Sequence, residues 1–163
     1  MSKIIHSTIE ILPQRKLIGI SAKVKALSPD IPQLWDKAME MNLFETLSQW
    51  PGLQSPDFWG AEYAMNGDTF TYLVCMVFDA ATKTPEGLES VLLPEMTVLH
   101  TQVEGPSHRI YGDTYPLSVE EAKRLGYTPD LDKDFCAEVY TQAFHDSRAQ
   151  GSTWVLDHIL PIV

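Results

Sequence analysis

Alternation of apolar and polar residues predicts short strands in the first half of the chain. Residues 8–12 alternate with a period of two, and residues 17–25 place Ile18 and Ile20 on one face. Residues 69–79 form the most hydrophobic run and are apolar on both faces. Because both faces of such a strand need cover, we expect it at the centre of a sheet.

Turn-forming residues place the other predicted strands. Asn66-Gly67-Asp68 is a hairpin signal that joins a strand over residues 58–63 to the central run. In the second half, apolar runs bounded by proline or glycine predict strands over residues 88–93, 96–103, 135–140 and 154–162.

Two segments have the apolar spacing of helices. Residues 28–32 (Ser-Pro-Asp-Ile-Pro) resemble a helix start, and the helical spacing continues to about Ser48. The second helix is predicted over residues 118–125, where Ser118 and Glu121 have capping-box spacing.

Similar peptides recur in the same order in the two halves. Leu12-Pro13-Gln14, for example, matches Leu93-Pro94-Glu95. The predicted fold class is therefore α+β, a pseudo-twofold repeat of two β-β-α-β(-β) units. The units form one antiparallel sheet with the helices on one face and a central ligand groove. We expect a single domain over residues 1–163, with halves of about 1–83 and 84–163.

Composition and charge narrow the function classes. The 163 residues are 44% hydrophobic and 21% charged, which is ordinary for a soluble globular domain. The formal net charge is −10 and Lys and Arg form no cluster, so direct nucleic-acid binding is not expected. Acidity of this kind is compatible with cationic ligands, although solubility alone also explains it.

The cysteines and the apolar runs indicate the cellular compartment of the protein. Cys75 and Cys136 lie in apolar runs without CxxC or zinc-type spacing, so we predict buried free thiols in a reducing cytosol. The first residues lack the apolar core of a signal peptide, and no apolar run approaches the roughly 20 residues that span a bilayer. We predict a cytoplasmic protein without metal or cofactor.

The strand over residues 135–140 carries one acid in its middle. Period-two alternation puts Cys136, Glu138 and Tyr140 on one face. A carboxylate on a core-facing strand is costly unless a positive or hydrogen-bonding group meets it. Glu138 therefore either faces water or binds a partner, and we favour a partner.

Several short segments occur in a characteristic order: the first predicted strand with Pro13, then Leu17–Ile20, Ile31–Trp35, Phe70–Val74, Leu92–Pro94, Ala137–Tyr140 and Ile159–Ile162. In this order they resemble the GyrI-like effector-binding domain. This family includes the ligand-binding modules of AraC-type and MerR-type regulators and free-standing single-domain relatives.

The resemblance implies a domain that binds organic, often aromatic and cationic, small molecules. It places Glu138 at the base of an aromatic pocket. The sequence departs from the regulators in showing no DNA-binding domain, so a separate regulator protein is a possible partner. It also departs over residues 105–117, where Gly112 and Pro116 interrupt the usual helix.

Aromatic residues are the candidates for the pocket walls. Ring faces attract cations, and rigid rings supply apolar area, although aromatic residues also dominate protein cores. Glu62 is the counterpart of Glu138 in the first half. The candidate ligand-binding residues besides Glu138 are Trp35, Trp59, Tyr63, Tyr72, Tyr111, Tyr115, Tyr140 and Trp154.

Two other classes of function stay open. Some proteins of similar fold look like hydrolases of strained small electrophiles, in which Glu138 would act as general base. The other class is a protein-binding module of the gyrase-inhibitor kind. We predict a non-enzyme. His100 and His158 lie on predicted strands, where they are candidate partners of buried acids or exposed polar residues, and we assign them no metal-binding or catalytic role. Adjacent residues of a strand point to opposite faces, so Asp157 cannot pair directly with His158.

Overall fold

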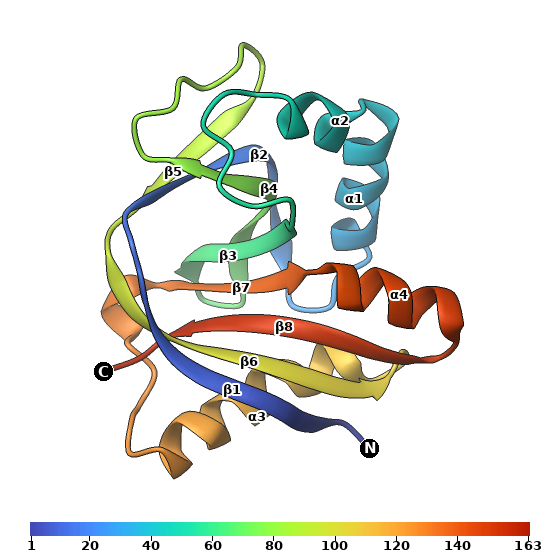
Figure 1. The fold of residues 1–163 in the computed structure, drawn as a ribbon, viewed down its shortest axis with the longest axis vertical. Helices are drawn as coiled ribbons and strands as arrows, with labels where there is room; N and C mark the ends of the chain where they lie inside the picture. Colours follow the sequence, from blue (N-terminus) through green and yellow to red (C-terminus); the bar gives the residue numbers. More distant parts are fainter. The chain divides into compact units, whose positions relative to one another are not determined.

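The computed structural model describes all 163 residues and divides into two compact units (Figure 1). Unit 1 comprises Met1–Ile11 and Thr97–Val163, and unit 2 comprises Leu12–Met96.

Unit 1 contains four strands and two α-helices. In sheet order the strands are β1 (Lys3–Leu12), β6 (Met96–Pro106), β8 (Thr153–Pro161) and β7 (Phe135–Tyr140). The helices are α3 (Ile110–Arg124) and α4 (Gln142–Gln150), with a short 3₁₀ turn at Leu131–Lys133.

The strand register defines one face of unit 1. Glu138 lies opposite His158, and His158 lies opposite Thr101. Directly opposed residues of antiparallel strands share a face, so all three side chains point to the same side. The Thr101 hydroxyl lies 2.9 Å from the Ser118 hydroxyl of α3. This side is therefore the α3 face, and its apolar part contains Leu99, Ala122, Leu160 and Ile162.

Unit 2 has the strand order β3 (Phe58–Asn66), β4 (Thr69–Asp79), β2 (Arg15–Lys25) and β5 (Glu89–Leu93), with helices α1 (Asp30–Glu40) and α2 (Leu43–Ser48). The strand β4 lies between β3 and β2 and is buried on both faces, which confirms the predicted central strand. The predicted hairpin is confirmed, with Gly67 at φ +67.

Helices and antiparallel strand pairs make up both units. The pairs β2–β4, β2–β5, β3–β4, β6–β8 and β7–β8 are all antiparallel. The predicted α+β class is confirmed, while the internal repeat and the central groove stay predictions.

The first predicted helix is wrong in its length. The chain forms α1 and α2 separately, because Asn42 between them adopts a left-handed conformation with φ +55. Asparagine tolerates this conformation better than other non-glycine residues. Side chains of both α2 and α1 join the core of unit 2, including Leu34, Ala38, Phe44 and Leu47.

The second predicted helix is wrong in its start. Helix α3 begins at Ile110 and continues through Pro116, and Ser118 lies inside the helix instead of capping it. The Ser118 hydroxyl donates to the Thr114 carbonyl oxygen at 2.9 Å. Every fourth residue from Ile110 to Ala122 is buried, so packing outweighs the helix-breaking tendency of proline.

Other segments also differ from the predictions. Strand β1 begins at Lys3, and α4 lies in a segment without a predicted element, since its apolar pattern is weak. Cys75 is fully buried, and this burial raises the pKa of its thiol. Cys136 is partly exposed, so its predicted burial is wrong.

None of the helices combines the length and the apolarity needed to cross a bilayer. The cytoplasmic location stays a prediction.

Candidate functional site

Glu138 projects from the middle of β7 on the α3 face. The burial pattern of β7 alternates between buried Phe135, Ala137 and Val139 and partly exposed Cys136 and Glu138. Glu138 is therefore partly reachable from solvent, and the period-two pattern predicted correctly that it shares a face with Cys136 and Tyr140.

Four aromatic residues from four elements of unit 1 meet at one place, which we call the aromatic cluster. Tyr111 of α3 meets Trp154 of β8 with ring centroids 6.2 Å apart. Phe144 of α4 lies 5.7 Å from Trp154 and 4.8 Å from Tyr140 of β7. All three contacts have the edge-to-face geometry that aromatic pairs prefer.

The charge of Glu138 acts on this cluster. Burial, and next the negative charge of Glu138, raise the pKa of Tyr111 to about 12. A hydrogen bond between the Tyr111 and Tyr140 side chains and the charge of Arg148 act in the opposite direction. Rings and a carboxylate therefore share one site in unit 1.

A cation already lies over one ring of the cluster. The Arg148 guanidinium carbon is 5.6 Å from the centroid of Trp154, within the range of a cation–π contact. The Trp154 Nε1 donates to the Gly151 carbonyl oxygen at 2.9 Å, which fixes the indole.

His158 is a buried polar neighbour of Glu138 on the α3 face. Burial, and next the charge of His100, lower the pKa of His158 to about 4, so its imidazole is neutral at pH 7. Its Nδ1 is buried without a hydrogen-bond partner. The ring of Tyr115 meets it edge-on at 6.0 Å between centroids. The site thus contains a second polar group near the acid.

A separate polar network lies on the opposite face of β6 and β8. The two ring nitrogens of His100 lie 2.7 Å from Asp157 Oδ2 and 3.1 Å from Glu10 Oε2. The hydrogen bond to Asp157 is the main cause that raises the pKa of His100. This network ties β1 to β6 and β8.

The remaining candidates lie in unit 2. Trp35 donates from Nε1 to the Tyr72 hydroxyl at 3.1 Å, and Tyr72 is fully buried. Trp59 is 7% exposed. Burial, and next the charge of Glu89, raise the pKa of Tyr63 to about 12. These residues therefore belong to unit 2, whereas the aromatic cluster with Tyr111, Tyr140 and Trp154 belongs to unit 1.

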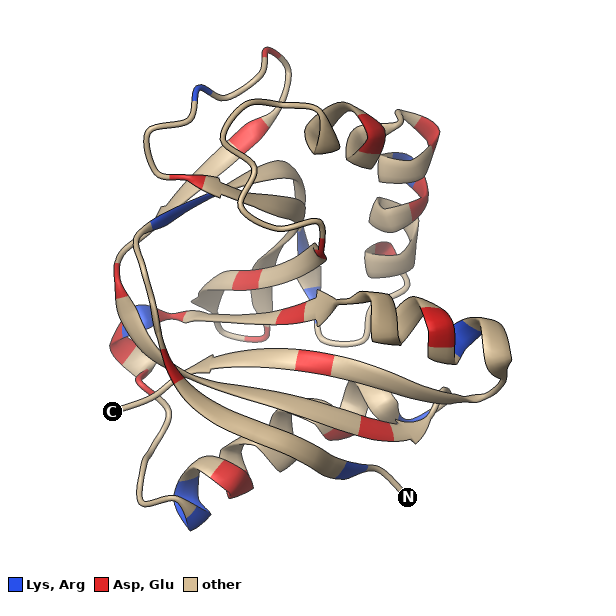
Figure 2. Cartoon of the chain, in the orientation of Figure 1, with Lys and Arg blue, Asp and Glu red and all other residues tan.

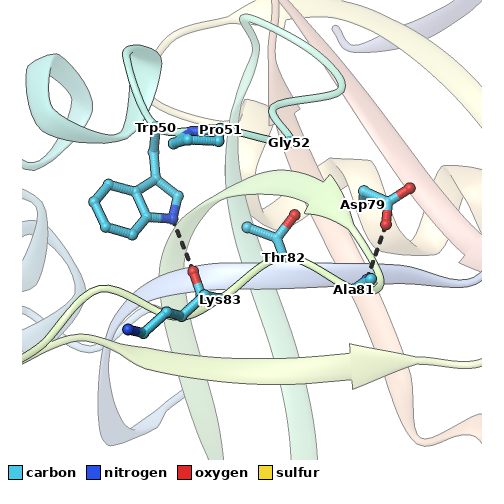
Figure 3. Close-up of a pocket in the computed structure, with 7 residues that line it drawn as sticks. All are labelled: Trp50, Pro51, Gly52, Asp79, Ala81, Thr82 and Lys83. Carbon is cyan, nitrogen blue, oxygen red and sulfur yellow. Dashed lines mark hydrogen bonds between the residues drawn. The ribbon is translucent and has the colours of Figure 1, made fainter.

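Unit 2 also contains an open surface pocket of about 490 Å³ (Figure 3). Its wall includes Trp50, whose Nε1 donates to the Lys83 carbonyl oxygen at 2.8 Å. The other lining residues are Pro51, Gly52, Asp79, Ala81 and Thr82. No predicted ligand-binding residue lines this pocket.

The GyrI-like small molecule binding domain model matches residues 6–163. The chain belongs to this family. The predicted membership in the GyrI-like family is confirmed, and this family is described as a small-molecule-binding domain. No curated protein shows a significant sequence match to the chain.

Solved structures share the fold of this GyrI-like domain at low identity. SAV2435 bound to tetraphenylphosphonium is 9% identical, with a TM-score of 0.69 over 98% of this chain and 94% of that chain. The EcmrR C-terminal domain is 13% identical, with a TM-score of 0.62 over 97% of both chains. A hydrolase from Listeria innocua is 10% identical, with a TM-score of 0.55 over 96% of this chain and 91% of that chain.

Sequence reasoning missed two residues of the candidate site in this GyrI-like domain. Phe144 and Arg148 lie on α4, a helix that the apolar pattern did not reveal. The sequence makes His158 a candidate partner of a buried acid without naming the acid, and in the sheet His158 lies opposite Glu138. Sequence alone does not contain the register of β7 against β8, so it offered no signal for this pair.

Proposed function

We propose that this GyrI-like domain binds lipophilic aromatic cations at the α3 face of unit 1. Glu138 supplies the negative charge, and Tyr111, Tyr140 and Trp154 supply aromatic surface. The observation that carries the proposal is the geometry: Tyr111, Tyr140 and Trp154 meet in the aromatic cluster, and Glu138 lies on the same face of β7 as Tyr140. The tetraphenylphosphonium of SAV2435 is a ligand of this chemical class.

Physical chemistry favours a cation at such a place. The attraction between a cation and a carboxylate grows as the surroundings become less polar, and the cluster excludes part of the water. Each ring face adds about 0.5 to 2 kcal/mol of cation–π attraction. The Arg148 guanidinium over Trp154 is an internal example of this contact.

The proposed role of this binding is sensing or sequestration of the cation. A regulator protein that receives the signal stays a predicted partner. Sensing and sequestration can be distinguished only after binding has been established, so the first experiment measures binding.

The test is isothermal titration calorimetry with three compounds of similar shape and different charge. These are tetraphenylphosphonium (cation), tetraphenylborate (anion) and triphenylphosphine oxide (neutral). We expect Glu138→Gln to weaken binding of the cation at least tenfold, which corresponds to ~1.4 kcal/mol of binding free energy. The affinity for the neutral compound should stay unchanged. Glu95→Gln, at an exposed position between β5 and β6, is the matched control.

Glu62→Gln belongs in the same series, because Glu62 is the corresponding acid of unit 2 and lies opposite Tyr72. Loss of cation affinity in Glu62→Gln but not in Glu138→Gln would place the binding acid in unit 2. Unchanged cation affinity in both variants would reject a carboxylate role altogether.

Hydrolysis of strained small electrophiles is a second candidate function, and the position of His158 favours it. This histidine lies opposite Glu138 on the same face, so a general base and a second polar group are available together. Incubation with a simple epoxide, followed by mass spectrometry of the diol, tests this candidate. Turnover that is lost in Glu138→Gln would support it, and turnover equal to buffer alone would exclude it for this electrophile.

A further inference from the structure

Strand β1 is an exposed edge strand of unusual composition. It is the terminal strand in the order of unit 1, and its ten residues contain no proline. Ile5, Ile9 and Ile11 are 43%, 42% and 67% exposed. Natural proteins usually protect long apolar edges with charges, prolines or bulges, because the free backbone groups can pair with another chain.

We propose that β1 pairs antiparallel with β1 of a second copy of this chain, centred on Thr8. The occupant is a second copy because the sequence of β1 is complementary to itself about this residue. A twofold axis perpendicular to the sheet brings residues together whose numbers add to 16.

The register centred on Thr8 pairs most apolar residues of β1 with apolar residues, and the exception is Ile9, which lies opposite Ser7 of the second copy. On the α3 face Ile5 lies opposite Ile11 of the second copy. On the other face Ile4 lies opposite Leu12 of the second copy, and both are partly exposed in one chain. Each of these apolar pairs occurs twice, because of the symmetry.

Hydrogen-bonding groups are complementary in the same register. His6 lies opposite Glu10 of the second copy, and both side chains are exposed. Glu10 already accepts from His100, so its carboxylate is held on the face that the His6 ring would meet. An imidazole N–H can donate to a carboxylate, and hydrogen-bonded side-chain pairs across strands stabilise the pairing.

Neighbouring symmetric registers lack this match. Centring on Ser7 pairs Ile5 with Ile9, but it places Ile4 opposite Glu10 and Lys3 opposite Ile11. Centring on Ile9 places His6 opposite Leu12. The apolar pairs and the His6–Glu10 pair therefore favour the Thr8-centred pairing among the symmetric ones.

Disulfide trapping tests the register directly. Paired Cα atoms of antiparallel strands lie within the distance that a disulfide spans. We expect Thr8→Cys to form a covalent dimer under mild oxidation, whereas Ser7→Cys and Ile9→Cys stay largely monomeric. The unchanged protein controls for cross-links through Cys75 and Cys136. A cross-link that forms through Ser7→Cys or Ile9→Cys but not through Thr8→Cys would overturn the proposal.

Sedimentation velocity on the full chain tests association without a covalent bond. One pair of edge strands buries a small interface, so we expect a concentration-dependent dimer. Ile5→Glu and Ile11→Lys should each weaken the homodimer. Their mixture should regain it, because Glu at position 5 then faces Lys at position 11.

The control is Leu131→Lys, which changes an exposed apolar residue outside β1. It should dimerise like the unchanged protein. A monomer at all concentrations, or a mixture of the two β1 variants that fails to associate, would overturn the proposal. These outcomes are independent of ligand binding, so they do not bear on the cation site.

Discussion

His100 and His158 lie on neighbouring strands, but their surroundings shift their pKa values in opposite directions. The imidazole of His100 meets two carboxylates, which favour the protonated form. The imidazole of His158 is buried beside an aromatic ring, and burial favours the neutral form. Each histidine therefore makes folding stability depend on pH, with opposite sign.

We predict that His158→Gln makes the protein less sensitive to acid. In the unfolded chain His158 binds a proton near pH 6.5, whereas in the folded chain it does so only near pH 4. The unfolded state is therefore favoured as pH falls from 6.5 towards 4, by roughly 3 kcal/mol in total. Urea unfolding of the variant and the unchanged protein at pH 7.5, 5.5 and 4.5 measures the difference.

His100→Gln serves as the comparison of opposite sign. In the unchanged protein the pKa of His100 is raised in the folded state. The stabilisation by His100 is therefore complete below its pKa in the unfolded chain and is lost as pH rises through its pKa in the folded chain. The stability deficit of this variant should therefore be largest at low pH. Equal pH slopes in the two variants would show that the surroundings of these histidines are not as described.

Helix α3 is the element that covers Thr101 and Leu99 and contributes Tyr111 to the aromatic cluster. It forms despite Gly112 and Pro116, because its buried positions recur every fourth residue and pack on the sheet. Pro116 cannot donate its backbone nitrogen to the carbonyl one turn earlier, and its ring crowds that turn. The tertiary contacts offset this local cost.

We predict that Pro116→Ala stabilises the protein by about 1 to 3 kcal/mol, because Ala restores the missing donor and suits a helix. Pro116 is exposed, so the change removes little packing. The increase should appear in the free energy of unfolding in urea. Glu120→Ala, at another exposed position of α3, is the matched control and should change stability little. A destabilised Pro116→Ala variant would mean that the helix requires the proline.

At the scale of the whole molecule, acidic residues outnumber basic ones by 22 to 12 and lie on strands, helices and loops of both units (Figure 2). The net charge of −10 produces a negative potential that attracts cations before they reach a specific site. This long-range contribution is screened by salt, with a Debye length of about 8 Å at physiological ionic strength.

We therefore predict that the affinity for tetraphenylphosphonium falls as salt rises, while that for triphenylphosphine oxide does not. A decrease of about two- to fivefold between low and physiological ionic strength is the scale expected from surface screening. Titrations of the unchanged protein at both ionic strengths measure it. Parallel behaviour of the cation and the neutral compound would indicate that charge does not guide binding.

Local sequence patterns were enough to predict several features of this protein. The α+β class, the central strand β4, the hairpin at Gly67 and the face shared by Glu138 and Tyr140 follow from periodicity and turn chemistry. These features depend on residues close in sequence, so the sequence contains their cause. The order of short segments also carried the family resemblance.

The tertiary structure alone decided which distant residues meet. Glu138 faces His158 because β7 and β8 pair in one register, and no local pattern specifies that register. Helix α3 continues through Pro116 because its buried side packs on a sheet whose strands come from distant parts of the chain. The sequence by itself thus determined the acid, the rings and the elements that carry them. Packing between elements decided that Tyr111, Tyr140, Phe144 and Trp154 form one cluster.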